Sequence, residues 1–259
     1  MSDTDFPASI ATPAKTINDV INQLTVIVEW SKQNNSRMGY FAALYRKVTI
    51  QVKKGIEDGF FDDGQRMERL DVIFANRYIH ACYQNQTDQT PTQSWVCAFD
   101  ATERWWPIVL QHLLMGMNAH INLDLGIAAA ETVPPEELPN LKGDFDKINA
   151  VLASLVGSIQ NELAEIWPIL GIMNRYLGSV EKTIINFSME KARDGAWSFA
   201  EELSPLTGES RSKAIADKDE MFAAFSNVIM HPGFTLSAVL KIVRLGERGT
   251  VRERIGILE

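Results

Sequence analysis

Residues 104–131 of the chain read RWWPIVLQHLLMGMNAHINLDLGIAAAE. Leu, Ile, Met and Ala recur through this stretch, and their spacing predicts one long helix that neighbouring helices cover on both sides. Pro107 either begins this helix in its first turn or kinks a longer one, because proline lacks the amide N–H of an interior helical hydrogen bond. We therefore expect an all-α fold that packs around a buried central helix.

Polar side chains interrupt this apolar helix. A polar group in an apolar environment costs free energy unless it is paired, so each of them needs a structural or a functional reason. At about 100° per residue, they fall into two seams that Leu, Ile and Met separate. One seam contains His112, His120 and Asp124, and the other contains Gln111, Asn118 and Asn122.

The pair that most suggests chemistry is His120 and Asp124. These residues lie four apart, so their side chains are neighbours on the helix surface. The spacing suits two ligands of one metal ion, and it also suits an imidazole that a carboxylate orients. His112 lies about 12 Å away along the axis and cannot share a tetrahedral or octahedral ion with His120. A hydrogen-bonded core role is the simpler alternative for each of them.

The second seam consists of amide side chains. We expect Gln111, Asn118 and Asn122 to make hydrogen bonds between helices, because buried amides are usually satisfied in this way. Asn118 has an alternative role, in which its amide holds an oxygen atom of a substrate.

Small and apolar residues of the central stretch suggest room for a ligand. Gly116 removes side-chain bulk next to His120, which admits either a ligand or a closely packed helix. Met117 and Trp106 either fill the core or line an apolar pocket. The candidate substrate-binding residues are His112, Gly116, Met117, Asn118, Asn122 and Trp106.

The helix predicted for residues 64–85 also mixes apolar and charged residues. Asp71 is the first candidate for a partner of His120 on a facing helix, and Glu68 shares its face. Arg77 lies on another face, where it can hold substrate oxygens. The alternative for Glu68 or Asp71 is a salt bridge with Arg77, Arg69 or another arginine. We expect this helix and the central helix to enclose a pocket for a small, largely apolar substrate.

The remaining sequence predicts further helices in the same domain. Residues 1–14 predict a flexible lead, and Thr16 or Asn18 can cap the first helix. The proline-rich residues 132–142 are the best candidate for a subdomain break in a single domain over residues 15–259. We expect a bundle-like domain of about nine to ten helices. Besides the two described above, they cover about residues 16–33, 37–59, 94–106, 144–167, 168–178, 181–204, 211–230 and 235–249.

The composition limits the environment and the partners. The net charge is −8 and the pI is about 5.1, which argues against nucleic acid as the main partner. Cys82 and Cys97 lack metal-type spacing and predict free thiols in a reducing compartment. The first residues lack the apolar core of a signal peptide, and the longest apolar run is too short to span a bilayer. We expect a cytoplasmic protein without stable membrane insertion, and a homodimer is left open.

Several common catalytic motifs are absent from the sequence. It contains no GxGxxG, Walker, GxSxG or CxxC motif, and no HExxH or DDxxD. The paired ExxH motifs of a di-iron helical bundle are also absent. These absences favour either an uncommon chemistry or simple binding.

Three stretches carry a resemblance to a known family. SRMGYFAALYRKVT (36–49), ERLDVIFANRY (68–78) and LQHLLMGMNAHINLDLGIAAAE (110–131) resemble an uncharacterised bacterial family that is known only as a domain of unknown function. The resemblance covers about residues 16–200. It implies a single helical domain, and it assigns no catalytic residue.

The first functional hypothesis is a metal-dependent hydrolase or oxygenase. His120, Asp124 and Asp71 would ligate the ion, and Glu68 or His80 could add a further ligand. Nitrogen and oxygen ligands without a thiolate suit zinc, iron or manganese. The ion would activate water or dioxygen beside the apolar pocket.

Two other hypotheses need no metal. In the second, a cyclase, isomerase or lyase uses His120 as the general acid or base, with Asp124 or Asp71 to orient it and Arg77 to hold substrate oxygens. In the third, the protein binds a small apolar or amphipathic molecule without turnover. The sequence favours an enzyme modestly, because its polar residues converge on apolar helices.

Overall fold

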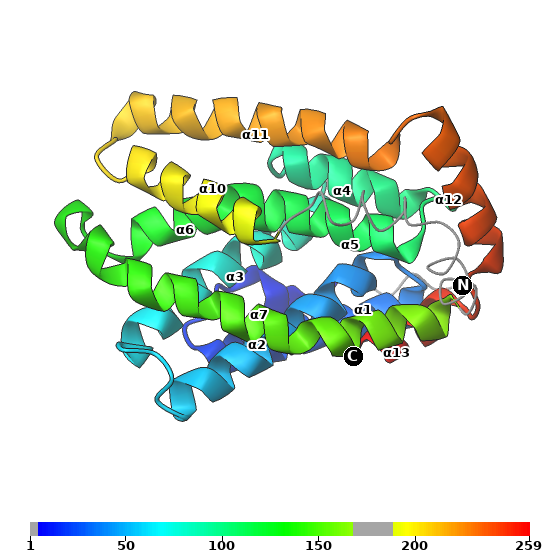
Figure 1. The fold of residues 1–259 in the computed structure, drawn as a ribbon, viewed down its shortest axis with the longest axis horizontal. Helices are drawn as coiled ribbons and strands as arrows, with labels where there is room; N and C mark the ends of the chain where they lie inside the picture. The colour runs from blue at the N-terminus through cyan, green and yellow to red at the C-terminus, as the bar shows by residue number, and fades with distance from the viewer. Residues whose placement is uncertain (1–4, 168–188) are drawn as a thin grey trace.

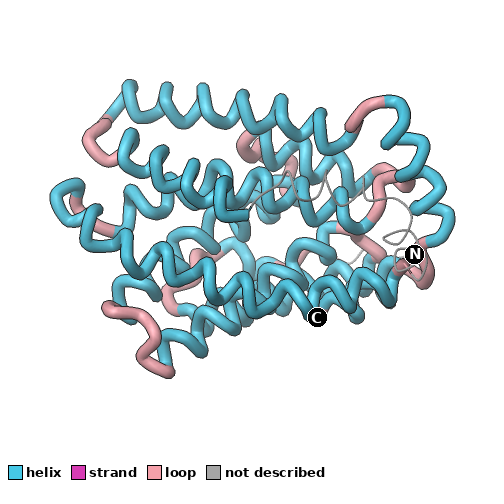
Figure 2. The backbone as a smooth tube through the Cα atoms, viewed as in Figure 1, coloured by secondary structure: helices cyan, strands magenta, loops and turns pink. Residues whose placement is uncertain are grey.

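The computed structural model of the chain describes residues 5–167 and 189–259. These residues contain eleven α-helices and no strand, which confirms the all-α prediction (Figure 2). The predicted helix over 168–178 and the start of the one over 181–204 lie outside the described residues. The helices are α1 (Ile17–Asn34), α2 (Met38–Glu57), α3 (Gly64–Gln86), α4 (Gln93–Glu103), α5 (Val109–Met117), α6 (Leu125–Thr132), α7 (Leu138–Ile166), α10 (Met189–Leu203), α11 (Gly208–Met230), α12 (Phe234–Gly246) and α13 (Val251–Leu258).

The central helix differs from the predicted one at its start and in its middle. Residues 104–108 are not helical, and the helix begins at Val109. Pro107 therefore neither begins nor kinks a helix, and it lies in the linker from α4. In the middle, residues Asn118–Asp124 form a π-helical segment between α5 and α6. A π turn includes one extra residue, which rotates the following side chains by about 100° relative to a straight α-helix.

Neighbouring helices enclose α5, the π-helical segment and α6, as the sequence predicts. Helix α2 packs against α5, α10 and α3 pack against α6, and α11 packs against the π-helical segment. Figure 1 shows α11 and α7 along opposite sides of the molecule, with α5 and α6 between them. Every residue from Val109 to Gly116 is consequently buried. This burial explains why the apolar pattern covers the whole circumference of the helix.

The ends of the predicted domain are more ordered than the sequence suggests. Within the predicted flexible lead, Ala8–Ala11 form a 3₁₀ helix. The side-chain amide of Asn76 on α3 pairs with both the N–H and the carbonyl of Ala14, at 2.8 and 2.9 Å. Thr16 caps α1 in a capping box with Asp19.

The proline-rich stretch 132–142 does not separate the helices around it. It contains a short 3₁₀ helix, Pro135–Glu137, and α7 already begins at Leu138. Leu138 and Leu141 are buried in the same apolar cluster as Ala196 of α10. The stretch is thus a tight connection within one core.

Two smaller features concern the cysteines and the C-terminal helices. Cys82 is buried and Cys97 is half-buried, and both are free thiols, as predicted. Within the described ranges no single helix is long and apolar enough to cross a membrane. By length and composition, α11 and α12 meet that requirement only as a pair, and a bend of 68° separates them.

Carboxylates from distant helices cap the starts of four helices. The free N–H groups at a helix start carry partial positive charge, so an acid placed there is stabilising. At α1, Glu68 accepts from the backbone N–H of Ile17 at 3.1 Å. At α3, Asp144 accepts from the backbone N–H groups of Asp62 and Asp63 at 2.7 and 2.9 Å. At α4, Asp219 accepts from those of Gln93 and Ser94 at 2.6 and 2.9 Å, and at α5, Glu247 accepts from that of Val109 at 2.6 Å. These contacts tie the helix ends to remote parts of the chain.

Replacing Asp144 by Ala should destabilise the fold strongly, because it removes two backbone acceptors and leaves Arg66 without its 3.0 Å partner. We expect the free energy of unfolding to fall by about 2–4 kcal/mol in urea titrations. Asp146→Ala is the matched control, since Asp146 is exposed and its salt bridge is to Lys142. It should cost only a few tenths of a kcal/mol. Equal losses in both variants would contradict the capping role.

Candidate functional site

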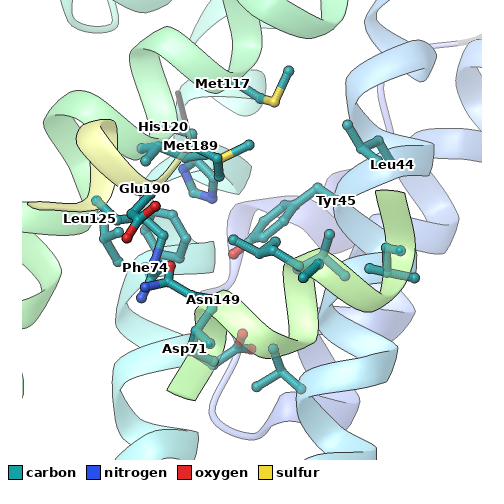
Figure 3. A pocket seen from close by; sticks show the side chains of 18 of the residues that line it. Leu44, Tyr45, Asp71, Phe74, Met117, His120, Leu125, Asn149, Met189 and Glu190 are labelled. Carbon is teal, nitrogen blue, oxygen red and sulfur yellow. The ribbon is translucent and has the colours of Figure 1, made fainter. Parts of the chain in front are cut away.

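A cavity of about 470 Å³ lies beside the central helix. Its walls come from α2, α3, the π-helical segment, α6, α7 and α10 (Figure 3). The sequence predicts a pocket between the 64–85 and 104–131 helices, and these supply two of the walls. Most of the lining is aliphatic or aromatic, including Val52, Leu70, Leu125 and Leu152. The volume and lining are typical of a site for a small, largely apolar molecule.

Four buried side chains line this cavity with a polar atom that has no hydrogen-bond partner among the described residues. In Arg193 this atom is Nε, while another guanidinium nitrogen donates to Phe145. In the other three it is the hydroxyl of Tyr45, Oδ2 of Asp71 and Nε2 of His120. Figure 3 shows these three side chains reaching the cavity from three different elements. Buried polar atoms are nearly always paired in folded proteins, so four unpaired ones at one cavity call for an explanation.

Aromatic rings hold the imidazole of His120 in place. Phe74 stacks on it with 3.6 Å between ring centroids and 6° between planes. Tyr45 meets it edge-on at 4.4 Å. The rings of Phe41, Tyr78 and Trp95 complete the surroundings at 5.8–6.0 Å. This packing leaves little rotational freedom to the imidazole.

The carboxylate of Asp124 connects this imidazole to two other helices. Its Oδ1 accepts from Arg77 Nε of α3 at 2.7 Å. Its Oδ2 accepts from Trp95 Nε1 of α4 at 2.8 Å and lies 3.4 Å from His120 Nδ1. The spacing of four residues between His120 and Asp124 thus produces the predicted contact. The longer distance makes the contact with the imidazole the weakest of the three.

Burial and hydrogen-bond partners set the protonation states of Asp124 and His120. Burial opposes ionisation of Asp124, but Arg77, His120 and Trp95 overcome it and hold the pKa of Asp124 below its ordinary value. Burial also lowers the pKa of His120 against the opposing effect of Asp124, so the ring is neutral at pH 7. A carboxylate only accepts hydrogen bonds, so Nδ1 carries the proton and Nε2 presents a lone pair to the cavity.

The carboxyl of Asp71 has a different environment. Burial raises its pKa from 3.8 to about 7, and the charge of Glu68 on the same helix adds to the effect. Burial likewise raises the pKa of Tyr45 well above its ordinary value, and the charges of Asp71 and Asp124 contribute. The Tyr45 hydroxyl therefore keeps its proton and can donate a hydrogen bond to a ligand.

A second cavity of about 650 Å³ lies on the other side of Asp124. Its lining is more polar and includes Arg77, Asp124, Trp95 and His80. Arg77 is partly exposed there. The ion pair between Arg77 and Asp124 thus stands between the two cavities, while His120 faces only the first.

The predicted metal ligands do not form a binding group. In residues 5–167 and 189–259, no three His, Cys, Asp or Glu side chains come together in a group that could hold a metal ion. Asp124 already pairs with Arg77 and Trp95, and its carboxylate has no open side for an ion beside His120. Asp71 and His120 line the same cavity, but no hydrogen bond or ion pair joins Asp71 to His120 or Asp124 among the described residues. These residues do not fit zinc, iron or manganese.

Several predicted substrate-binding residues lie elsewhere. His112 is buried and does not line the cavity; its ring packs 5.6 Å from that of Tyr40. Burial lowers the pKa of His112 to about 3. Trp106 lies in the linker before α5, with its ring 5.8 Å from that of His231. His112 and His120 therefore do not line the same cavity.

Gly116 and Met117 have different outcomes. A Cβ atom on Gly116 would collide with the ring of Phe41, so this glycine admits a closely packed helix rather than a ligand. Met117 lines the cavity, as predicted.

Two of the three residues of the amide seam, Gln111 and Asn118, make the predicted interhelical hydrogen bonds, whereas Asn122 bonds within its own helical segment. Asn118 donates to the carbonyl of Phe222 and to the Ser226 hydroxyl of α11, at 2.8 and 3.0 Å. Asn122 donates to Asn118 at 2.8 Å. Gln111 donates to the carbonyl of Ile229 and also caps the start of α5. None of the three lines the cavity, and the substrate-binding role of Asn118 and Asn122 stays a prediction.

Sequence reasoning missed three contributors to the site. The hydroxyl of Tyr45 has no sequence signal that separates it from that of a core tyrosine. The N–H of Trp95 binds Asp124. Arg193 is buried, lines the cavity, donates to the carbonyl of Phe145 and packs over its ring at 4.4 Å. Its position within an otherwise apolar face of α10 could have indicated burial.

Comparison with known proteins identifies a family. Residues 17–232 match a family described as a family of unknown function, DUF5995. The match confirms the resemblance and extends it beyond residue 200. No curated protein and no solved structure matches the chain. The cytoplasmic location and the bacterial source stay predictions.

Replacing Asp71 by Asn tests the environment of its carboxyl. The pKa of Asp71 is raised from 3.8 to about 7 in the folded protein. At a pH between these two values the carboxyl is protonated in the folded chain and ionised in the unfolded chain. The wild type should therefore lose stability relative to Asp71→Asn as the pH rises from about 4 to about 7, by on the order of 4 kcal/mol. Urea unfolding at a series of pH values measures this difference. A constant difference over that range would contradict a buried, unpaired carboxyl.

Proposed function

The chain belongs to the DUF5995 family, and from its site we propose that it is a metal-free enzyme that acts on a small, largely apolar molecule. The substrate occupies the cavity, and His120 transfers a proton to and from it. Isomerases, cyclases and lyases use this kind of proton transfer. The observation that carries the proposal is the convergence of three unpaired buried polar groups, on Tyr45, Asp71 and His120, at one apolar cavity.

A bound substrate would satisfy these groups. An unpaired buried donor or acceptor costs roughly 1–3 kcal/mol of folding stability. Three such groups together therefore lower the stability of the protein without a ligand. Active sites retain such costs because the same groups contact the reacting molecule. The apolar walls would bind the body of the substrate, and the polar groups would fix its orientation.

The role of His120 follows from its protonation state. The neutral ring presents Nε2 to the cavity, and its lowered pKa keeps that nitrogen free to accept a proton at pH 7. When Nε2 takes the proton, Asp124 stabilises the imidazolium through the Nδ1 contact of 3.4 Å. Arg77 moderates that stabilisation, so the proton can return to the substrate.

The hydroxyl of Tyr45 complements the base. The ring that carries it meets the imidazole of His120 edge-on, with 4.4 Å between ring centroids. Because the pKa of Tyr45 is raised, the hydroxyl stays protonated and can donate to an oxygen on which negative charge develops as His120 removes a proton. A base beside a neutral donor suits removal of a proton next to a carbonyl group.

A second candidate function is ligand binding without turnover. The stacking of Phe74 on His120 at 3.6 Å and the ring of aromatic neighbours hold the imidazole rigidly. A rigid imidazole can serve simply as a fixed hydrogen-bond acceptor in a carrier protein. The two candidates share the cavity and differ only in whether Nε2 exchanges a proton with the ligand.

The substitution His120→Gln separates the two candidates. Small lipophilic ketones are incubated with the protein in D₂O, and exchange of their α-protons is followed by NMR. We expect the wild type to accelerate exchange of the ketones that bind, and His120→Gln to lower the rate by roughly 10²–10⁴-fold, which is the usual contribution of a general base.

The matched control is His112→Gln, a buried histidine of the same helix outside the cavity. It should leave the exchange rate unchanged. Binding without exchange in the wild type would establish the carrier and contradict the enzyme. If no apolar compound binds, as judged by thermal shift and calorimetry, both candidates fail.

A further inference from the structure

The carboxyl of Asp71 stands out among the buried acids of the described residues. Asp124, Asp144 and Glu247 each form an ion pair with an arginine, and Asp219 accepts from two backbone N–H groups. Asp71 is 7 % exposed and forms no hydrogen bond or ion pair within residues 5–167 and 189–259. A buried acid without a partner is costly, so it implies a partner that enters with the ligand.

We propose that the cavity selects a protonated amine, which Asp71 binds, so that the ligand is a lipophilic amine. This inference rests on the proposed function, because it concerns the ligand of the same cavity. An ammonium group supplies both the hydrogen-bond donor and the positive charge that Asp71 lacks.

The electrostatics around Asp71 favour a cation. Glu68, one turn earlier on α3, adds negative charge, as its effect on the pKa of Asp71 shows. His120 is neutral, and the charge of Asp124 is balanced by Arg77. A carboxylate ligand would meet repulsion at this end of the cavity, and a neutral ligand would leave the charge of Asp71 unbalanced.

Arg193 is the one positively charged side chain on the cavity wall in the described part of the chain. It does not neutralise Asp71. Its guanidinium donates to the carbonyl of Phe145 and packs over the Phe145 ring. The charges of Asp146 and Asp194 act on it favourably. Burial outweighs their effect and lowers the pKa of Arg193 to about 10. Within the described residues no ion pair joins Arg193 to Asp71, and its Nε has no hydrogen-bond partner.

The cavity walls suit the rest of such a ligand. The rings of Phe41, Tyr45 and Phe74 line the cavity and can attract a cation through their faces. Aliphatic side chains, among them Leu70 and Leu152, surround the remaining space and can bury a hydrocarbon body. An ammonium group joined to an apolar body matches both kinds of wall.

Three ligands that differ only in their end group test the inference. Decylamine, 1-decanol and decanoate are titrated into the full-length protein by calorimetry at pH 8, below the concentrations at which they form micelles. We expect decylamine to bind about tenfold more tightly than 1-decanol, since a hydrogen bond to a charged group contributes roughly that much. Decanoate should bind most weakly.

Asp71→Asn should abolish the preference for the amine while 1-decanol still binds. The matched control is Asp217→Asn, which removes the same charge from an exposed residue of α11 and should keep the preference. The wild-type comparison stands by itself if Asp71→Asn does not fold.

Each other outcome overturns the amine inference in a recognisable way. Equal binding of amine and alcohol, or a preference that survives Asp71→Asn, refutes it and leaves the proposed function intact. Tightest binding of decanoate would assign recognition to Arg193 instead. If none of the three binds and no apolar ketone binds either, the cavity is not a ligand site, and the proposed function fails as well.

Discussion

The buried carboxylate of Asp124 is the contact on which the candidate site depends. An isolated charge at this depth would be prohibitively unstable, and Arg77 of α3 and Trp95 of α4 satisfy it at 2.7 and 2.8 Å. The same contacts fix the positions of α3 and α4 against the central helix. The aromatic side chains that surround His120 then follow, because Phe74 belongs to α3 and Trp95 to α4. Loss of either partner would leave a buried charge uncompensated, which commonly costs about 3–5 kcal/mol.

The acidic composition has a structural use in the interior of the molecule. Carboxylates of Glu68, Asp144, Asp219 and Glu247 cap the starts of helices that lie far away in the sequence. Each of these acids satisfies backbone N–H groups that would otherwise lack a partner. Asp71 is the exception, since it is buried beside a cavity without such a contact. The contrast is the physical basis for assigning it to a ligand.

The candidate site could be predicted from the sequence only where its contacts are local. The pairing of His120 with Asp124 followed from a spacing of four residues, which places side chains together on any helix. Asp71 and Arg77 were both recognised on the facing helix, but the expected contact between Asp71 and His120 does not form, and Arg77 pairs with Asp124. The rotation of α3 about its axis decides between them. That rotation depends on packing against seven other elements, which no local pattern of α3 encodes.

The sequence by itself determined the all-α class, the approximate extents of most helices, the interhelical role of Gln111 and Asn118 and the local pair at residues 120 and 124. Each of these depends on propensity or on helical periodicity within one segment. The tertiary structure alone decided where the π-helical segment forms and that His112 is buried away from the cavity. It also decided that the Tyr45 hydroxyl and the Asp71 carboxyl have no hydrogen-bond partner among the described residues. A π turn is unfavourable in an isolated helix and needs tertiary contacts to persist. An acid becomes costly only when other elements bury it without a partner, which no pattern within one helix reveals.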